Sequence, residues 1–111
     1  MANIYHITTL EDWSLAKKTG HYLSSSLKNE GFIHCSTATQ YLRIANSLFS
    51  GRKDTLLLEI DEDKVNAEIR YENLEGGSEH FPHIYGPLNL DSVLRVIDFP
   101  SDENGQYSSP I

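Results

Sequence analysis

The sequence contains a single cysteine, Cys35, so it can form no internal disulfide and no multi-cysteine metal site. The opening residues MANIYHITTLEDW lack the basic start and apolar core of a signal peptide. No apolar run approaches the roughly 20 residues that a membrane span requires. From these absences we expect a cytoplasmic protein with no membrane partner.

Basic residues are also scarce. The chain has 9 Lys and Arg against 16 Asp and Glu, for a net charge of −7. An acidic surface repels the phosphates of nucleic acids, so broad nucleic-acid binding is not expected, although a local basic pocket would still accept a small anionic ligand. The sequence contains no dinucleotide-binding glycine fingerprint, P-loop or nucleophile elbow.

The length of 111 residues is that of one domain, with room for one core and one pocket. We expect a single folded domain over residues 1–100. Residues 101–111 are rich in Ser, Asp, Gly and Pro, a composition that predicts a flexible C-terminal tail. Composition and spacing leave the oligomeric state open.

Hydrophobic patterning predicts both strands and helices. Two helices are expected over residues 10–18 and 38–49, opened by the capping boxes Thr8/Glu11 and Thr37/Gln40. Residues 21–27 fit either a weak strand or a loop with a helical turn. The leucine run in residues 55–60 predicts a strand buried on both faces, at the centre of a sheet. The other expected strands or extended segments are residues 3–8, 32–36, 67–72, 83–86 and 94–99.

The segment GFIHCST, residues 31–37, is the first that could carry chemistry. A strand is expected to end here and a capped helix to begin, and a helix N-terminus favours anions. His34 and Ser36 would share one face of the strand, so Ser36, Thr37 and His34 could hold a phosphate or ribose. The alternative is that the hydroxyls only cap the helix and His34 is structural.

The segment HFPHIYGPL, residues 80–88, is the second. On an extended chain, His83 and Tyr85 face the same side and offer a titratable ring and a hydroxyl. Gly86 would allow a ligand or another strand to approach closely. The alternative is a rigid corner fixed by Pro82 and Pro87.

Three further residues are candidates. His6 lies in an otherwise apolar strand and needs a partner if it is buried. Arg70 and Glu72 share one face of their strand and could orient a ligand or form an ion pair. A metal site is not expected, because neighbouring strand residues such as His34 and Cys35 point to opposite faces. The same geometry argues against Cys35 as a nucleophile.

The chain resembles the bacterial proteins grouped as the domain of unknown function 952 family. The resemblance runs from about Ile4 to Phe99 and rests on the segments IYHIT, GFIHCST, EIRYE and FPHIYGPLNLDSV. That family is similar to the ADP-ribosyltransferase-like fold, which implies a compact α+β domain with a split, mostly antiparallel sheet and two or three helices. The resemblance also implies NAD as a candidate cofactor.

By resemblance, His6 takes the place of the first-strand residue that holds the ribose. Ser36 and Thr37, preceded by His34, take the second-strand place. The transferase glutamate has no clear match, since Glu72 lies in a different motif and His83 stands where a polar residue is needed. This gap argues against ordinary protein ADP-ribosylation.

Three hypotheses follow. The first is an enzyme, a transferase or hydrolase, in which His34 and His83 are catalytic. In this hypothesis a nucleotide-like ligand is bound by a second set of residues, His6, Ser36, Thr37, Tyr85, Arg70 and Glu72. The second is a non-catalytic module that binds a small ligand in the same pocket. The third is a structural protein whose histidines only pack.

Overall fold

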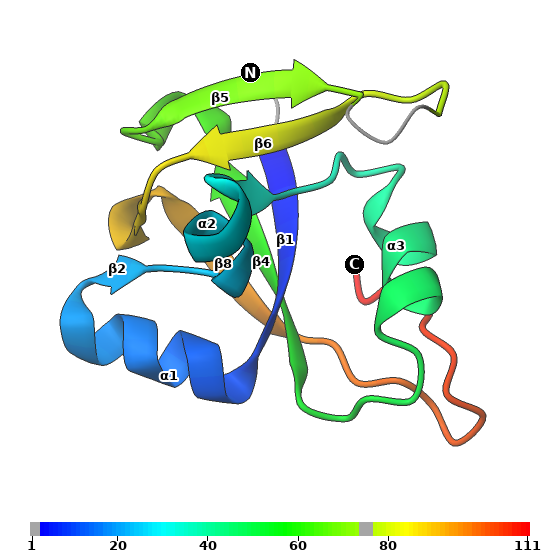
Figure 1. Cartoon of the computed structure of the whole chain (residues 1–111). Coiled ribbons are helices and arrows are strands. Elements are labelled where there is room, and N and C mark those ends of the chain that lie inside the picture. The colour runs from blue at the N-terminus through cyan, green and yellow to red at the C-terminus, as the bar shows by residue number, and fades with distance from the viewer. Residues whose placement is uncertain (1–2, 74–76) are drawn as a thin grey trace.

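The computed structural model describes residues 3–73 and 77–111. Three α-helices are present: α1 (Leu10–Thr19), α2 (Ser25–Glu30) and α3 (Tyr41–Leu48) (Figure 1). The strands are β1 (Asn3–Thr9), β2 (His21–Tyr22), β3 (Ile33–His34), β4 (Thr55–Asp61), β5 (Glu68–Glu72), β6 (Phe81–Tyr85), β7 (Leu88–Asn89) and β8 (Val93–Asp98). Two short 3₁₀ turns, η1 (Glu62–Lys64) and η2 (Leu90–Ser92), complete the described elements.

The strands form three antiparallel sheets with the orders β1-β4-β8, β2-β7 and β3-β6-β5. A bridge between Tyr5 and Ser36 joins the first sheet to the third, with two backbone bonds of 2.7 Å. The expectation of an α+β domain with mostly antiparallel sheets and two or three helices is therefore confirmed. No helix in the described part of the chain is long and apolar enough to cross a membrane.

Strand β4 occupies the centre of its sheet, between β1 and β8, as its leucines predict. Residues 55–60 are all buried because alternate side chains enter two different cores. Leu56 and Leu58 join the core formed with α1 and the third sheet, whereas Leu57 joins the core beneath α3. Burial on both faces explains why the strand lacks the alternating polar pattern of a half-exposed strand.

The predicted helix starts need correction. Thr9, and not Thr8, caps α1 by accepting a hydrogen bond from the Asp12 N–H. α3 begins at Tyr41, after a turn over residues 38–40, so Thr37 is not its N-cap. The Gln40 side chain nevertheless accepts the Thr37 N–H at 3.0 Å, which is half of the expected capping box.

Residues 21–27, left open between strand and helical turn, contain both. His21 and Tyr22 form β2, and α2 then begins at Ser25 with Ser24 as its N-cap. Gly31 ends α2 in the left-handed conformation that glycine adopts without steric cost. This short helix stands at one end of the cavity described below.

Residues 101–111, for which the composition predicts a mobile tail, include an aromatic residue that packs against the domain. Tyr107 is 5% exposed and lies in the core with Phe99 and Tyr41. Its hydroxyl donates to the Phe49 carbonyl at 2.8 Å, and its backbone N–H donates to Asn46 Oδ1 at 2.7 Å. The polar composition of this segment gave no indication that Tyr107 packs into the core.

Gly86 follows β6 where a neighbouring chain segment approaches closely. A Cβ placed on Gly86 would lie 2.9 Å from the Ala67 Cβ. The close approach expected at this glycine is therefore to another segment of the chain. We expect Gly86→Ala to lower the free energy of unfolding by about 1–3 kcal/mol, because the backbone must move to relieve the overlap. Chemical denaturation measures this, and Gly77→Ala, with open space around its Cβ position, is the matched control.

Candidate functional site

The third sheet separates its side chains cleanly by face. Its cross-strand register places His34 opposite His83, and His83 opposite Arg70, so the three side chains form one row. The neighbouring row of Ile33, Ile84 and Ile69 points to the other face and into the core. The apolar row holds the sheet on the domain, and this leaves the histidine row free for other roles.

A carboxylate orients His83. The ring Nδ1 lies 3.0 Å from Glu72 Oε1, and the His83 residue is only 4% exposed. The Tyr85 hydroxyl donates to the same carboxylate oxygen. These hydrogen bonds, from Tyr85 first and His83 second, lower the pKa of Glu72 and keep it ionised at neutral pH. An ionised Glu72 requires the hydrogen on His83 Nδ1, and in that neutral tautomer Nε2 carries the lone pair.

Aromatic rings fix the position of the two histidines. Phe32 stacks on His83 with ring centroids 4.3 Å apart, and its edge contacts the His34 ring at 4.9 Å. The two imidazoles lie 5.3 Å apart at nearly right angles. His34 Nε2 pairs with Glu30 Oε2 at 2.9 Å. Each histidine is therefore held by one carboxylate, and neither is locked to buried backbone.

His6 is held at both ring nitrogens. Its Nδ1 donates to the His34 carbonyl at 2.5 Å, and its Nε2 lies 2.8 Å from the Tyr22 hydroxyl. Burial lowers the pKa of His6 to about 4, so the ring is neutral at pH 7. A neutral ring with its hydrogen on Nδ1 keeps its lone pair on Nε2, beside the Tyr22 hydroxyl, which donates to Thr8 Oγ1 at 2.8 Å. His6 therefore supports the backbone of His34.

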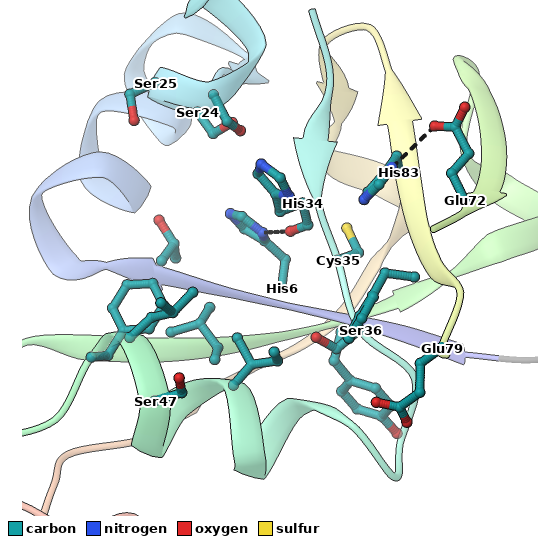
Figure 2. Close-up of a pocket in the computed structure, with 18 of the residues that line it drawn as sticks. His6, Ser24, Ser25, His34, Cys35, Ser36, Ser47, Glu72, Glu79 and His83 are labelled. Carbon is teal, nitrogen blue, oxygen red and sulfur yellow. Dashed lines mark hydrogen bonds and ion pairs between the residues drawn. The ribbon is translucent and has the colours of Figure 1, made fainter. Parts of the chain in front are cut away.

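A cavity of about 810 Å³ opens beside these residues. It extends from the serines around the start of α2, across β1 and β3, to α3 (Figure 2). Of the eight residues proposed from the sequence, five line it, namely His6, His34, Ser36, Glu72 and His83. Thr37, Tyr85 and Arg70 do not line it. Tyr85 reaches the site indirectly, through its hydrogen bond to Glu72.

Arg70 has partners away from the cavity. It pairs with Glu68 on its own strand at 3.0 Å, and its guanidinium lies 4.4 Å from the centre of the Tyr85 ring. The described ion pair of Arg70 is therefore with Glu68 on the same strand, and differs from the cross-strand ion pair considered from the sequence. The stack of Arg70 on Tyr85 supports the position of the hydroxyl that binds Glu72.

The anion site expected at residues 36 and 37 lacks its geometric basis. α3 begins four residues after Thr37, and the two backbone N–H groups already have internal partners. The Ser36 N–H donates to the Tyr5 carbonyl at 2.7 Å, and the Thr37 N–H donates to Gln40. Ser36 remains a candidate ligand-binding residue, because it lines the cavity and its hydroxyl can contact a ligand. Thr37 also keeps a hydroxyl that could bind a ligand, but Thr37 does not line the cavity.

The sequence reasoning missed two parts of the site. The first is the run Ser24-Ser25-Ser26, which lines the cavity around the start of α2. The sequence signal for this part was a serine followed seven residues later by Gly31, a pattern typical of a short capped helix. The second is Glu30, the last residue of α2, which contacts His34 because the chain turns back at Gly31 into β3. Residues 3–73 and 77–111 contain no group of three or more metal-binding side chains. Burial raises the pKa of the Cys35 thiol, which disfavours the thiolate form.

Comparison with known proteins identifies the family. The family model described as Protein of unknown function (DUF952) matches residues 7–96. The chain belongs to the DUF952 family. The crystal structure of protein CC0527 from Caulobacter crescentus shares 31% sequence identity with this DUF952 protein. It aligns over 96% of this chain and 93% of its own, with a TM-score of 0.86.

The solution NMR structure of CC0527 is similar to this chain as well. It shares 32% identity over 95% of this chain and 90% of its own, with a TM-score of 0.82. The DUF952 fold described above is therefore also found in an experimentally determined relative. None of the curated proteins compared with this chain matches it.

Proposed function

We propose that this DUF952 protein is a small-molecule hydrolase or transferase in which His83 is the general base and Glu72 orients it. The observation that carries the proposal is the 3.0 Å contact between His83 Nδ1 and Glu72 at the wall of a cavity. A carboxylate on one ring nitrogen fixes the tautomer, so that the other nitrogen can accept a proton. A cavity of about 810 Å³ has the size of a typical ligand site.

The proposed chemistry is a proton abstraction followed by displacement. His83 Nε2 takes a proton from a water molecule or a ligand hydroxyl, and the oxygen then forms a bond to the electrophilic carbon. The bond from that carbon to the leaving group breaks, and the leaving group departs with the electron pair. Glu72 stabilises the imidazolium formed, and the proton passes from His83 to the leaving group or to solvent.

The ligand proposed is nucleotide-like, with NAD as the candidate that the ADP-ribosyltransferase-like resemblance implies. His6, Ser36 and His34 line the cavity together. By that resemblance His6 takes the ribose-holding place on the first strand, and Ser36, preceded by His34, takes the place on the second. With NAD the electrophilic carbon is the ribose carbon bonded to nicotinamide, which leaves as the neutral base. Titration of NAD and ADP-ribose followed by NMR tests this step. An absence of shifts at these residues up to millimolar ligand would remove nucleotide binding.

Removing the charge of Glu72 tests the catalytic role. We expect Glu72→Gln to lower kcat for the hydrolysis of a bound ligand by about 10²-fold, because the amide no longer stabilises the imidazolium. His83→Gln should lower kcat at least as far. Glu68→Gln is the matched control, since Glu68 shares the strand of Glu72 and does not line the cavity. Equal rates in all three variants and the wild type would exclude the proposed base.

A second candidate is a binding module without catalysis. Its support is that the described partners of the two histidine side chains are carboxylates and aromatic rings, and no serine or cysteine donates to either ring. Such a module would bind its ligand without turnover. His83→Gln would then change affinity alone, which equilibrium titration and product analysis distinguish from a loss of kcat.

A further inference from the structure

We infer that the ligand of this cavity is a phosphate-free hydroxylated molecule with an aromatic ring, a nucleoside or similar small glycoside. This inference rests on the proposed hydrolase or transferase chemistry and replaces NAD, which carries two phosphates, by a ligand without phosphate. Four features of the cavity wall carry it: its charge, the state of its backbone N–H groups, the chemistry of its hydroxyls and its aromatic side chains.

The charged side chains of the cavity wall disfavour a phosphate. In the described part of the chain, three carboxylates line the cavity, Asp12, Glu72 and Glu79, against the single guanidinium of Arg52. Arg52 is already bound to Asp54 by two hydrogen bonds of 2.8 and 3.0 Å. Two of the carboxylates also have partners, Glu79 with Arg43 and Glu72 with His83, and Asp12 lies in no described ion pair. A phosphate in the cavity would therefore be repelled by the negatively charged side chains of its wall.

The backbone donors at the junction between β3 and α3 do not compensate for this charge. Phosphates are commonly held by free N–H groups at a strand-to-helix junction. Here the corresponding N–H groups of Ser36 and Thr37 are bonded to Tyr5 and Gln40. Because phosphate oxygens only accept hydrogen bonds, they need such donors or cations to replace their water.

The hydroxyls of the wall suit a sugar. Serines reach the cavity from four places: α2 and its N-cap, the bridge residue that follows β3, α3, and the segment before β6. They are Ser24, Ser25, Ser26, Ser36, Ser47 and Ser78. Figure 2 shows Ser24 and Ser25 at one end of the cavity and Ser47 at the other, with the histidines between them. A serine hydroxyl both donates and accepts, as a sugar hydroxyl does, so the two match without net charge.

Aromatic side chains supply a place for a heterocyclic ring. Tyr22, Phe49 and Phe81 line the same cavity as the serines. Planar rings pack on such side chains with a gain beyond the area that they bury. A ligand with a flat base at one end and a hydroxylated ring at the other satisfies both parts of the wall.

Paired ligands that differ by one phosphate test the inference. We use isothermal titration with adenosine, guanosine, uridine and nicotinamide riboside, each beside its 5′-monophosphate, and with NAD and ADP-ribose. The expected result is a nucleoside that binds about tenfold tighter than its monophosphate, because the added charge meets the carboxylates. High salt should narrow the difference by screening it.

The outcomes separate the two proposals. A monophosphate, NAD or ADP-ribose that binds as tightly as the nucleosides or more tightly would overturn this inference and leave the proposed function intact. An absence of binding by every probe up to millimolar concentration would overturn both.

A charge variant locates the effect. Asp12 lies in the first turn of α1 and lines the cavity. Asp12→Asn should reduce the preference for the nucleoside over its monophosphate by about threefold. The control is Asp63→Asn, which removes an exposed carboxylate on η1 that does not line the cavity. An equal change in both variants would contradict a local charge effect.

Discussion

Replacing Tyr107 with alanine is expected to lower the free energy of unfolding by about 3–5 kcal/mol, the range for removing a buried aromatic side chain. Tyr107 packs against Phe99 with ring centroids 4.8 Å apart. Its hydroxyl also lies 3.1 Å from Thr55 Oγ1 on the central strand. The tail therefore closes the core beneath α3, and chemical denaturation measures what it contributes.

A second variant separates packing from hydrogen bonding. Tyr107→Phe keeps the ring and loses the hydroxyl that donates to the Phe49 carbonyl, so it should cost about 1–2 kcal/mol. Unchanged stability in Tyr107→Ala would mean that the tail is mobile in solution, as its composition predicts.

Stability should fall as the pH drops from 7 to 4, with about 3 kcal/mol of the loss due to His6. The folded pKa of His6 is about 4 because the ring is buried, whereas an unfolded histidine titrates near 6.5. Between these values the unfolded chain binds the extra proton, so stability is complete above about pH 6.5 and is lost progressively below it. Denaturant melts at half-unit pH steps measure the slope.

His6→Asn isolates this contribution. The amide replaces the ring without a titrating group, so the slope between pH 5 and 6.5 should flatten. This window lies above the usual pKa of glutamate, and therefore above the range in which Glu59 and Glu72, with their lowered pKa, begin to contribute. His21→Asn, at an exposed position on β2, is the control. Parallel slopes in wild type and His6→Asn would contradict the assignment.

The strongly patterned parts of the fold could be predicted from the sequence. The leucines of β4 indicate burial on both faces, and the two cores on its sides explain why. Helix ends were placed less well, since Thr8 and Thr9 are equivalent caps by sequence and only the chain direction after β1 selects Thr9. The tail shows the limit of composition, because one aromatic residue outweighs several polar neighbours.

The sequence could predict individual residues of the candidate site, but not the contacts between them. Alternation along residues 81–85 places His83 and Tyr85 on one face, which the register confirms. The contact between His83 and Glu72 depends on the pairing of β5 with β6 across a loop, and no local pattern specifies it. The occupied N–H groups of residues 36 and 37 likewise depend on Tyr5 and on a turn before α3. These contacts are determined by pairing between segments far apart in the sequence, which short motifs do not specify.

The meeting of β1 and β3 explains why this small domain has a hollow at all. The strands exchange backbone bonds at Tyr5 and Ser36, but the next carbonyl toward β3, that of His34, is bonded by an imidazole. The described pairing stops here because the His6 ring occupies the bonding position of that carbonyl. Had the pairing continued, one unbroken sheet would have filled this space with interlocked side chains. The cavity therefore exists where the pairing between these two segments stops, and substitutions that extend the pairing would close the cavity.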